Sequence, residues 1–358
     1  MIKPLHLAVR SLAPTHVLDF WATRFRPAWS LARPMVRLVD RQVASSDAMT
    51  LTLRANRHWA GFQPGQHANL GAELDGRRVT RSYSLSKVSG RKDCVSITVK
   101  AVAGGQLSQH LCEHAKIGDF FEIGPAFGGM LVPEVVQSPR LFLAAGSGIT
   151  PLMAMTRELA ARGMPAPVTL LYWTRVRSER CFVPELRALT QRYPQFQVRF
   201  LLTREAALDA DEFEGRIDAA SVAAAVDDMA AREVFACGPA GFVESARALV
   251  ATQARSFMAE AFSPPVPVAA DERGTVKITL AKSGKVLEIP RDRSLLTALE
   301  AQGLAPASGC RMGICNTCAC PKPSGATRNL LTGDTEAEPV SALRLCVNSA
   351  TSDLVLEL

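Results

Sequence analysis

Cys310-Arg-Met-Gly-Ile-Cys-Asn-Thr-Cys318, with Cys346 further along the chain, places three cysteines on one short loop and a fourth at a distance. The spacing is C-x4-C-x2-C, and the last cysteine follows the third by 28 positions. Three thiolates on a tight loop and one distant thiolate suit two irons bridged by two sulfides. Gly309 and Gly313 let the backbone wrap such a cluster and turn amide N–H groups toward its sulfurs. The predicted ligands of a 2Fe–2S cluster are Cys310, Cys315, Cys318 and Cys346.

Two other interpretations of this cysteine loop are a structural zinc site and unliganded buried cysteines. Zinc sites usually pair two C-x2-C units, which this loop does not do. Cys320 falls outside the spacing and is interpreted as a neighbour of the cluster. The block resembles a plant-type ferredoxin domain, and this resemblance implies a β-grasp fold and one-electron transfer.

Composition and charge narrow the class of protein around this loop. The chain has 358 residues, of which 47% are hydrophobic and 21% charged, so two or three domains are expected. Neither an 18-residue apolar run nor a signal-peptide pattern is seen, which predicts a cytoplasmic protein. Residues 1–45 hold seven Lys/Arg and two Asp, most of the formal net charge of +7. Without a nucleic-acid-reading motif, this bias favours an acidic partner or an anionic membrane surface over nucleic acid.

The hydrophobic pattern changes along the chain and predicts several domains. Residues 35–135 form short alternating strands between Gly/Pro turns, which predicts an antiparallel β-barrel. Residues 136–262 alternate strand and helix, which predicts a doubly wound parallel sheet. Residues 263–274 are a Pro-rich linker, and residues 275–358 are the ferredoxin-type domain. Ahead of them, residues 1–34 form a helical extension with interleaved aromatic and basic side chains.

Arg81-Ser-Tyr-Ser84 follows a predicted strand, and Gly105-Gln-Leu-Ser108 lies about 20 residues on. An arginine suits a pyrophosphate, a tyrosine ring can lie on an isoalloxazine face, and a small hydroxyl can hydrogen-bond near the flavin N5. With Pro64-Gly65-Gln66 and Gly124-Pro125, these segments resemble the flavin domain of the ferredoxin-NADP reductase family. The resemblance implies FAD, with FMN as the alternative, and a catalytic role for Ser84. The implied flavin-binding residues are Gln66, Arg81, Ser82, Tyr83, Ser84, Gly105, Leu107 and Ser108.

Ala144-Ala-Gly-Ser-Gly-Ile-Thr-Pro151 ends a strand and opens a helix, where two glycines permit close approach and the helix N-terminus offers N–H donors to a pyrophosphate. The third glycine of the Rossmann fingerprint is absent. Cys237-Gly238-Pro239 follows a later strand, and both segments resemble the nicotinamide domain of the same family, in which the cysteine lies beside the reacting carbon. The alternative for Cys237 is a small thiol packed at a strand end. The implied residues are Gly146, Gly148, Thr150, Pro151, Cys237, Gly238 and Pro239, with Cys237 as a second catalytic residue.

The end of the second strand of this domain bears on the choice between NADPH and NADH. Thr174, Arg175 and Arg180 suit a 2′-phosphate, which favours NADPH, whereas Glu179 keeps NADH open. Alternatively, the arginines simply face solvent. Glu260-Ala-Phe262 resembles an element near the flavin in relatives with a C-terminal cluster, or is the end of a helix.

The order of flavin, nicotinamide and ferredoxin domains resembles oxygenase-type reductases with a C-terminal cluster. The resemblance implies that two electrons from NADPH pass singly through the flavin and the cluster to a partner di-iron oxygenase. The N-terminal extension most resembles reductases of membrane fatty-acid desaturases, and its aromatic and basic residues suit peripheral contact with the inner face of the membrane or packing on the flavin domain. The alternatives are a reductase for a soluble aromatic-ring or acyl-CoA hydroxylase, and a flavin/2Fe–2S redox sensor without turnover.

Overall fold

The computed structural model describes residues 33–262 and 274–358. The predicted extension over residues 1–34 and the predicted linker over residues 263–274 therefore lie outside the described residues, apart from positions 33, 34 and 274. The chain divides into two compact units. The first takes in the described residues up to Val136 with Thr150–Pro165 and Thr174–Gln195, and the second holds the other described residues. Among the described helices, none is both long and apolar enough to cross a membrane.

An antiparallel sheet dominates the first unit. Within the described residues its strand order is β4-β3-β7-β1-β2-β6-β5. Alternating apolar residues give these strands one buried face; in β2, for example, Leu51 and Leu53 are both fully buried. The strands are β1 (Met35–Ser45), β2 (Ala48–Ala55), β3 (His67–Leu74), β4 (Arg77–Ser84), β5 (Ser86–Lys87), β6 (Cys94–Lys100) and β7 (Phe120–Phe127).

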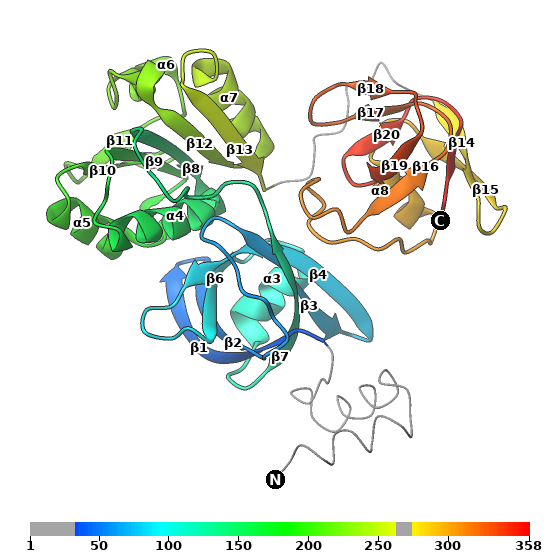
Figure 1. Cartoon of the computed structure of the whole chain (residues 1–358), viewed down its shortest axis with the longest axis horizontal. Coiled ribbons are helices and arrows are strands. Elements are labelled where there is room, and N and C mark those ends of the chain that lie inside the picture. Colours follow the sequence, from blue (N-terminus) through cyan, green and yellow to red (C-terminus); the bar gives the residue numbers. More distant parts are fainter. Residues whose placement is uncertain (1–32, 263–273) are drawn as a thin grey trace, which may run out of the picture. The chain divides into compact units, whose positions relative to one another are not determined.

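The two edge strands of this sheet, β4 and β5, are separated in the chain by the single residue Leu85. Strands joined by one residue cannot lie at distant edges of a flat sheet, so the sheet must be curved, and Leu85 between the two edge strands is buried. Figure 1 shows the curved strands of this sheet. Helix α3 (Gln106–Gln109) and a π-helical turn (His110–His114) contribute Leu107 and Leu111 to the core of the curled sheet. The antiparallel flavin-type fold predicted from the sequence is confirmed.

The first unit also contains two longer helices. They are α4 (Ile149–Ala161) and α5 (Val183–Arg192). Pro151 lies in the first turn of α4, where a proline removes no intrahelical hydrogen bond. Arg157 of α4 makes two hydrogen bonds of 2.7 and 2.8 Å to the carboxylate of Glu185 in α5, which fixes the two helices against each other.

In the second unit, six described strands form a sheet of order β11-β10-β9-β8-β12-β13. Strand β8 pairs in parallel with β9 on one side and with β12 on the other, so the strand order reverses between β8 and β12. This is the doubly wound order that the sequence predicts, and ligands bind such sheets at the reversal point. The strands are β8 (Arg140–Ala145), β9 (Val168–Thr174), β10 (Phe196–Leu202), β11 (Glu212–Glu214), β12 (Glu233–Gly238) and β13 (Ser256–Ala261); the helices are α6 (Ala219–Ala223) and α7 (Ala240–Val250).

Strand β13 corrects one of the two interpretations of the Glu260-Ala-Phe262 segment. The segment is not the end of a helix, because Ser256–Ala261 pairs in parallel with β12 along its whole length. Ala, Met and Glu favour helices intrinsically, and pairing with the exposed edge of β12 overrides that preference.

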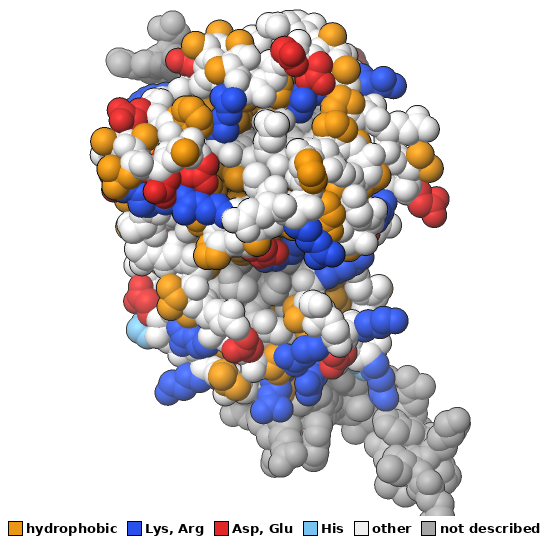
Figure 2. Space-filling model, turned by 90° about the vertical axis from the view of Figure 1, so that its left-hand side faces the viewer, with side chains coloured by type: hydrophobic (Ala, Val, Ile, Leu, Met, Phe, Trp, Pro, Cys, Tyr) orange, Lys and Arg blue, Asp and Glu red, His pale blue; other side chains and the backbone are white. Residues whose placement is uncertain are grey.

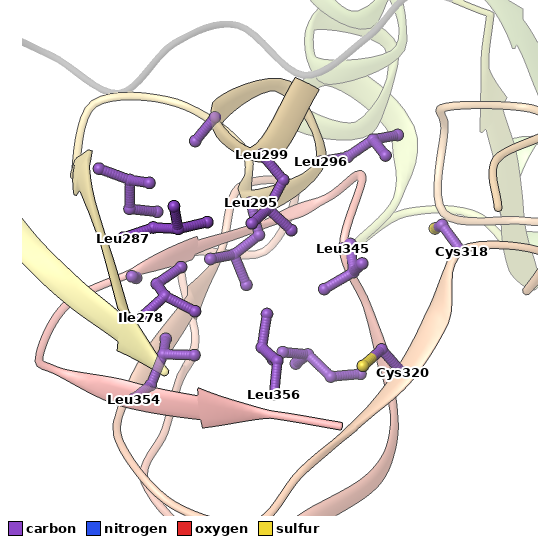
Figure 3. Packing of buried hydrophobic residues seen from close by; sticks show 14 of the residues in the cluster. Ile278, Leu287, Leu295, Leu296, Leu299, Cys318, Cys320, Leu345, Leu354 and Leu356 are labelled. Atoms are coloured by element: carbon purple, nitrogen blue, oxygen red, sulfur yellow. The ribbon is translucent and has the colours of Figure 1, made fainter. Parts of the chain in front are cut away.

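The remaining part of the second unit begins at β14 (Thr275–Leu280), which pairs antiparallel with β15 (Val286–Pro290) and parallel with β21 (Leu354–Leu356). Helix α8 (Leu295–Ala301) starts at Ser294, whose hydroxyl accepts a hydrogen bond from the Thr297 N–H. Leu295, Leu296 and Leu299 of this helix belong to one apolar core with Ile278, Leu287 and Leu354. Figure 3 shows Leu296 pointing to the other side of the helix from Leu287. The shorter strands are β16 (Ala319–Lys322), β17 (Thr327–Asn329), β18 (Thr335–Glu336), β19 (Val340–Arg344) and β20 (Asn348–Ala350).

Candidate functional site

The cysteine loop surrounds its sulfurs with backbone N–H groups. The Cys310 Sγ accepts N–H groups from Met312 at 3.3 Å, Ile314 at 3.4 Å and Cys315 at 3.3 Å. The Gly313 N–H donates to the Cys346 Sγ at 3.3 Å. Amide dipoles that point at sulfur stabilise the negative charge of thiolates, so this loop is prepared for a cluster.

All four predicted cluster ligands come together in the structure. Cys310 interacts with both Cys315 and Cys346, and Cys346 also interacts with Cys318. Cys320 shares the apolar core with Cys318 and Cys346 (Figure 3), but its Sγ donates to the Pro321 carbonyl at 3.4 Å and not to the sulfur of another cysteine. The four sulfurs together with the N–H groups around them fit a 2Fe–2S cluster.

Two arginines hold the backbone of the cysteine loop in place. Arg311 has a left-handed conformation, with φ of 60°, and its guanidinium makes a two-point ion pair with Glu300 of α8. Arg344 of β19 donates to the Gly313 carbonyl. Sequence reasoning missed both anchors, because neither their partners nor their distances are visible in the local pattern.

Strand β4 carries the predicted flavin-binding residues. The Ser82 Oγ donates to Asn69 Oδ1 on β3, an amide that the sequence analysis did not single out. The Tyr83 hydroxyl is buried and makes no hydrogen bond within the described part of the chain, while its ring is partly exposed. Burial raises the pKa of this hydroxyl well above its usual value. A buried donor beside an accessible ring fits a flat ring system with polar edges, such as a flavin.

The remaining predicted flavin residues differ in what their side chains can do. Gly105 has no room for a side chain, since an added Cβ would lie 2.5 Å from the Ser108 Oγ. The Ser108 Oγ donates to the Gly105 carbonyl at 3.3 Å and so holds the turn. The Leu107 side chain is in the protein core, which leaves only its backbone to face a cofactor. The Gln66 side chain accepts the Gln63 N–H at 2.8 Å and shapes the turn before β3.

The nicotinamide segments meet backbone to backbone at the reversal point of the parallel sheet. A Cβ added to Gly148 would lie 2.0 Å from the Cys237 carbonyl oxygen. Gly238 is nearly as confined, with Ala145 2.9 Å from its Cβ position. Both glycines are therefore required for the two loops to approach, and the N-terminal turn of α4 lies beside them in the chain.

Cys237 is completely buried, and this burial raises the pKa of its thiol well above the usual value. The nearby Glu260 carboxylate raises the Cys237 pKa further. Cys237 is therefore a neutral thiol at physiological pH, which suits a packing role rather than nucleophilic or acid–base chemistry. Glu260 lies directly opposite Cys237 across the β12–β13 ladder, and the Phe262 N–H donates to the Gly238 carbonyl at 2.8 Å.

One hydrogen bond joins a predicted nicotinamide residue to a predicted flavin residue. The Thr150 Oγ1 donates to the Ser84 Oγ at 3.0 Å, and both side chains are buried. The two residues lie 66 positions apart in the chain. This contact connects the start of α4 to the end of β4.

The last residue of β9 and the loop after this strand hold the residues predicted to choose between NADPH and NADH. The Thr174 hydroxyl donates to the Val176 carbonyl at 3.1 Å, and the Arg180 Nε donates to the Arg177 carbonyl at 3.2 Å. Arg175 forms an ion pair with Glu179 at 2.6 Å. The alternative in which these arginines simply face solvent is therefore wrong for the buried Arg180, whereas the Arg175 side chain is 53% exposed and makes its ion pair at the surface.

Three family models match the chain in sequence order. They are an oxidoreductase FAD-binding domain at residues 35–130, an oxidoreductase NAD-binding domain at residues 142–248 and a 2Fe–2S iron-sulfur cluster binding domain at residues 278–347.

Known proteins resemble the chain over most of its length. An NADPH oxidoreductase of Mycobacterium tuberculosis is 33% identical over 93% of this chain and 86% of its own. One component of the 1,2-phenylacetyl-CoA epoxidase of Escherichia coli is 31% identical over 72% of this chain and 77% of its own. Phthalate dioxygenase reductase, described as a modular structure for electron transfer from pyridine nucleotides to [2Fe–2S], is 25% identical with a TM-score of 0.60, over 90% of this chain and 97% of that one.

The chain therefore belongs to the ferredoxin reductase family whose members combine FAD-binding, NAD-binding and 2Fe–2S domains. It is an NAD(P)H-dependent oxidoreductase that uses FAD and a 2Fe–2S cluster.

Proposed function

We propose that this protein is the reductase component of a multicomponent oxygenase and delivers electrons from NADPH to a separate iron-containing oxygenase. The observation that carries the proposal is the four-cysteine loop on the same chain as the flavin and nicotinamide sites. A flavin converts a two-electron donor into single-electron steps, and a 2Fe–2S cluster carries one electron at a time. An oxygenase that activates oxygen stepwise needs such a supply.

The chain's own residues have mainly positioning roles in this proposal. Ser84 and Thr150 orient the flavin strand and the nicotinamide loop toward each other through their hydrogen bond. Arg81 and the turn from Gly105 to Ser108 would hold the flavin pyrophosphate, and the Tyr83 ring would offer its partly exposed face to the flavin. The loops that begin at Gly146 and at Gly238 would receive the nicotinamide, and the close approach of Gly148 to the buried Cys237 holds these loops together. Positioning of this kind supplies much of the rate in transfer between two bound groups.

The names of the relatives support one class of acceptor over another. One relative is a component of a phenylacetyl-CoA epoxidase, and another is the reductase of a phthalate dioxygenase. We therefore propose an aromatic-ring or acyl-CoA oxygenase as acceptor, in preference to the membrane fatty-acid desaturase expected from residues 1–34. That segment lies outside the described residues.

A cluster-ligand variant tests the division of labour between the two centres. In Cys315→Ser, we expect NADPH oxidation with a two-electron dye to persist and transfer to cytochrome c, a one-electron protein acceptor, to be abolished. Cys320→Ser is the matched control, because Cys320 is buried nearby but lies outside the ligand set. It should keep both activities. Loss of dye reduction together with cytochrome c reduction in Cys315→Ser would contradict the proposal.

A vesicle experiment separates the two classes of acceptor. The full-length holoprotein is sedimented with vesicles that contain phosphatidylglycerol, at low and at physiological salt. We expect it to stay in the supernatant at physiological salt. Stable sedimentation there would instead favour the desaturase as acceptor.

A further inference from the structure

In the loop after β9, the guanidinium of Arg175 already forms an ion pair with the carboxylate of Glu179. Arg175 follows the strand directly, and its Nη2 lies 2.6 Å from Glu179 Oε1. Its Nε donates to Glu179 Oε2 at 3.1 Å, so the carboxylate binds the guanidinium at two points. This ion pair raises the pKa of Arg175. The two-point geometry is also the one with which arginine binds a phosphate group.

A second cation touches the same carboxylate. Lys100, the last residue of β6, has its Nζ 3.4 Å from Glu179 Oε2 and 2.7 Å from Asp47 Oδ2. The cluster of Arg175, Glu179, Lys100 and Asp47 therefore has two positive and two negative side chains. Its formal charge is zero.

The backbone around Glu179 is fixed by the curled sheet. The Ser46 N–H, in the turn between β1 and β2, donates to the Ser178 carbonyl at 2.9 Å. The Glu179 side chain is only 12% exposed, whereas that of Arg175 is 53% exposed. The carboxylate is thus held in position, while the arginine remains within reach of a ligand.

An ion pair alone would not indicate a binding site, because basic and acidic side chains are interspersed over the surface of this protein (Figure 2). Arg175 and Glu179 differ from such surface pairs in their position in the fold. They follow the second strand of a doubly wound sheet, where dinucleotide-binding domains distinguish a ribose 2′-hydroxyl from a 2′-phosphate.

We propose that Glu179 determines how strongly this protein prefers NADPH to NADH, because its carboxylate occupies the arginine fork that a 2′-phosphate requires. The inference rests on the nicotinamide site of the proposed function. A 2′-phosphate must displace Glu179 from Arg175 and meets a cluster of zero net charge. A ribose 2′-hydroxyl meets no such competition and can donate to the carboxylate. Glu179 therefore acts against NADPH and in favour of NADH, as a repulsive element for one of the two ligands.

The test measures binding directly and does not depend on turnover. The holoprotein is titrated calorimetrically with adenosine 2′,5′-bisphosphate and with AMP, which differ only in the 2′-phosphate. In Glu179→Gln, we expect the ratio of the AMP Kd to the bisphosphate Kd to rise about tenfold above wild type, because a charged competitor for Arg175 is lost. The ratio of kcat/KM for NADPH to that for NADH should rise in the same direction.

Asp47→Asn is the matched control, since it removes the same charge from the same cluster but leaves the Arg175–Glu179 pair intact. Its affinity ratio should stay within about twofold of wild type, as expected for a partly screened charge. An equal rise of the affinity ratio in both variants would overturn the inference, because the loss of one negative charge anywhere in the cluster would then explain the rise. A fall in Glu179→Gln would also overturn it and would show that Glu179 prepares Arg175 for the phosphate.

The inference and the proposed function fail in different ways. If wild type binds both nucleotides but Glu179→Gln leaves their ratio unchanged, the role of Glu179 is wrong and the nicotinamide site stands. If wild type binds neither nucleotide, the nicotinamide site itself is wrong, and the inference falls with it. A misfolded variant would lose affinity for both nucleotides, which differs from the expected gain for one.

Discussion

The hydroxyls of Thr150 and Ser84 lie 3.0 Å apart, buried at the start of α4 and at the end of β4. Thr150 comes directly after the glycine loop that approaches Cys237, and Ser84 ends the strand that carries Tyr83. One hydrogen bond thus connects the segment proposed to hold the nicotinamide with the segment proposed to hold the flavin.

This hydrogen bond should couple the two residues energetically. We expect Ser84→Ala and Thr150→Val each to slow flavin reduction by NADPH about tenfold, which corresponds to about 1.4 kcal/mol. The double variant should be little slower than either single variant, because both remove the same interaction. Stopped-flow absorbance of the flavin measures all four rates. Fully additive losses would show that the hydroxyls act independently.

Gly148 should tolerate no side chain. Gly148→Ala places a Cβ where the Cys237 carbonyl oxygen lies 2.0 Å away, so one of the two loops must move. We expect a loss of about 3 kcal/mol in the free energy of unfolding and much weaker NADPH binding, with flavin retained. Denaturant unfolding and nucleotide titration measure these effects. Gly241→Ala is the control, because its Cβ would meet no atom within 4 Å, and a normal nucleotide affinity is expected there.

Glu300 should stabilise the cysteine loop through Arg311. In Glu300→Gln the two-point ion pair is lost, and Arg311 must keep its left-handed backbone with weaker support. Both side chains are about a third exposed, so we expect only about 0.5–1 kcal/mol of lost stability. The sharper readout is a faster loss of the cluster's visible absorbance in the presence of an iron chelator. An unchanged rate would show that Arg344 alone is sufficient to hold the loop.

The carboxylate of Glu158 on α4 should make stability depend on pH. Burial acts to raise its pKa, but Lys87 and Arg162 outweigh burial and hold the pKa below its usual value. A lowered pKa means that the ionised group stabilises the fold above the pKa of the unfolded chain, and that this contribution is lost as the pH falls. Glu158→Gln should therefore cost about 0.5 kcal/mol at pH 7 and less than that at pH 3.5.

Denaturant midpoints at the two pH values measure the Glu158 effect. Glu244→Gln is the control, because Glu244 is exposed and no shift in stability is expected from it. If the cost of Glu158→Gln were the same at both pH values, ionisation would not be its cause.

Local patterns in the sequence were sufficient for most of the fold. The alternation in Met49–Arg54 and the apolar run Leu141–Ala145 correspond to β2 and β8, because burial on one or both faces sets those periods directly. Strand β13 was missed for the opposite reason. Its residues favour a helix, and only the parallel edge of β12 makes them a strand.

The sequence predicted those parts of the candidate site in which the ligand requires a fixed residue spacing, such as the four cysteines of the cluster. It did not predict the parts that depend on contacts between residues far apart in the chain. Asn69, Glu300 and Arg344 belong to the second kind, since each meets its partner only through the fold. Glu179 was noticed in the sequence as an ambiguous acid. The ion pair between Glu179 and Arg175 indicates that Glu179 disfavours NADPH, which the sequence alone did not indicate.

The central claim is that electrons pass from NADPH through the flavin to the cluster within one chain. An anaerobic titration of the holoprotein with NADPH, followed by visible absorbance and electron paramagnetic resonance, tests it most directly. We expect flavin and cluster bands both to bleach, with an uptake of about three electrons per chain, and we expect Cys315→Ser to take up about two. Bleaching of the flavin alone in wild type, with the cluster left oxidised, would contradict it.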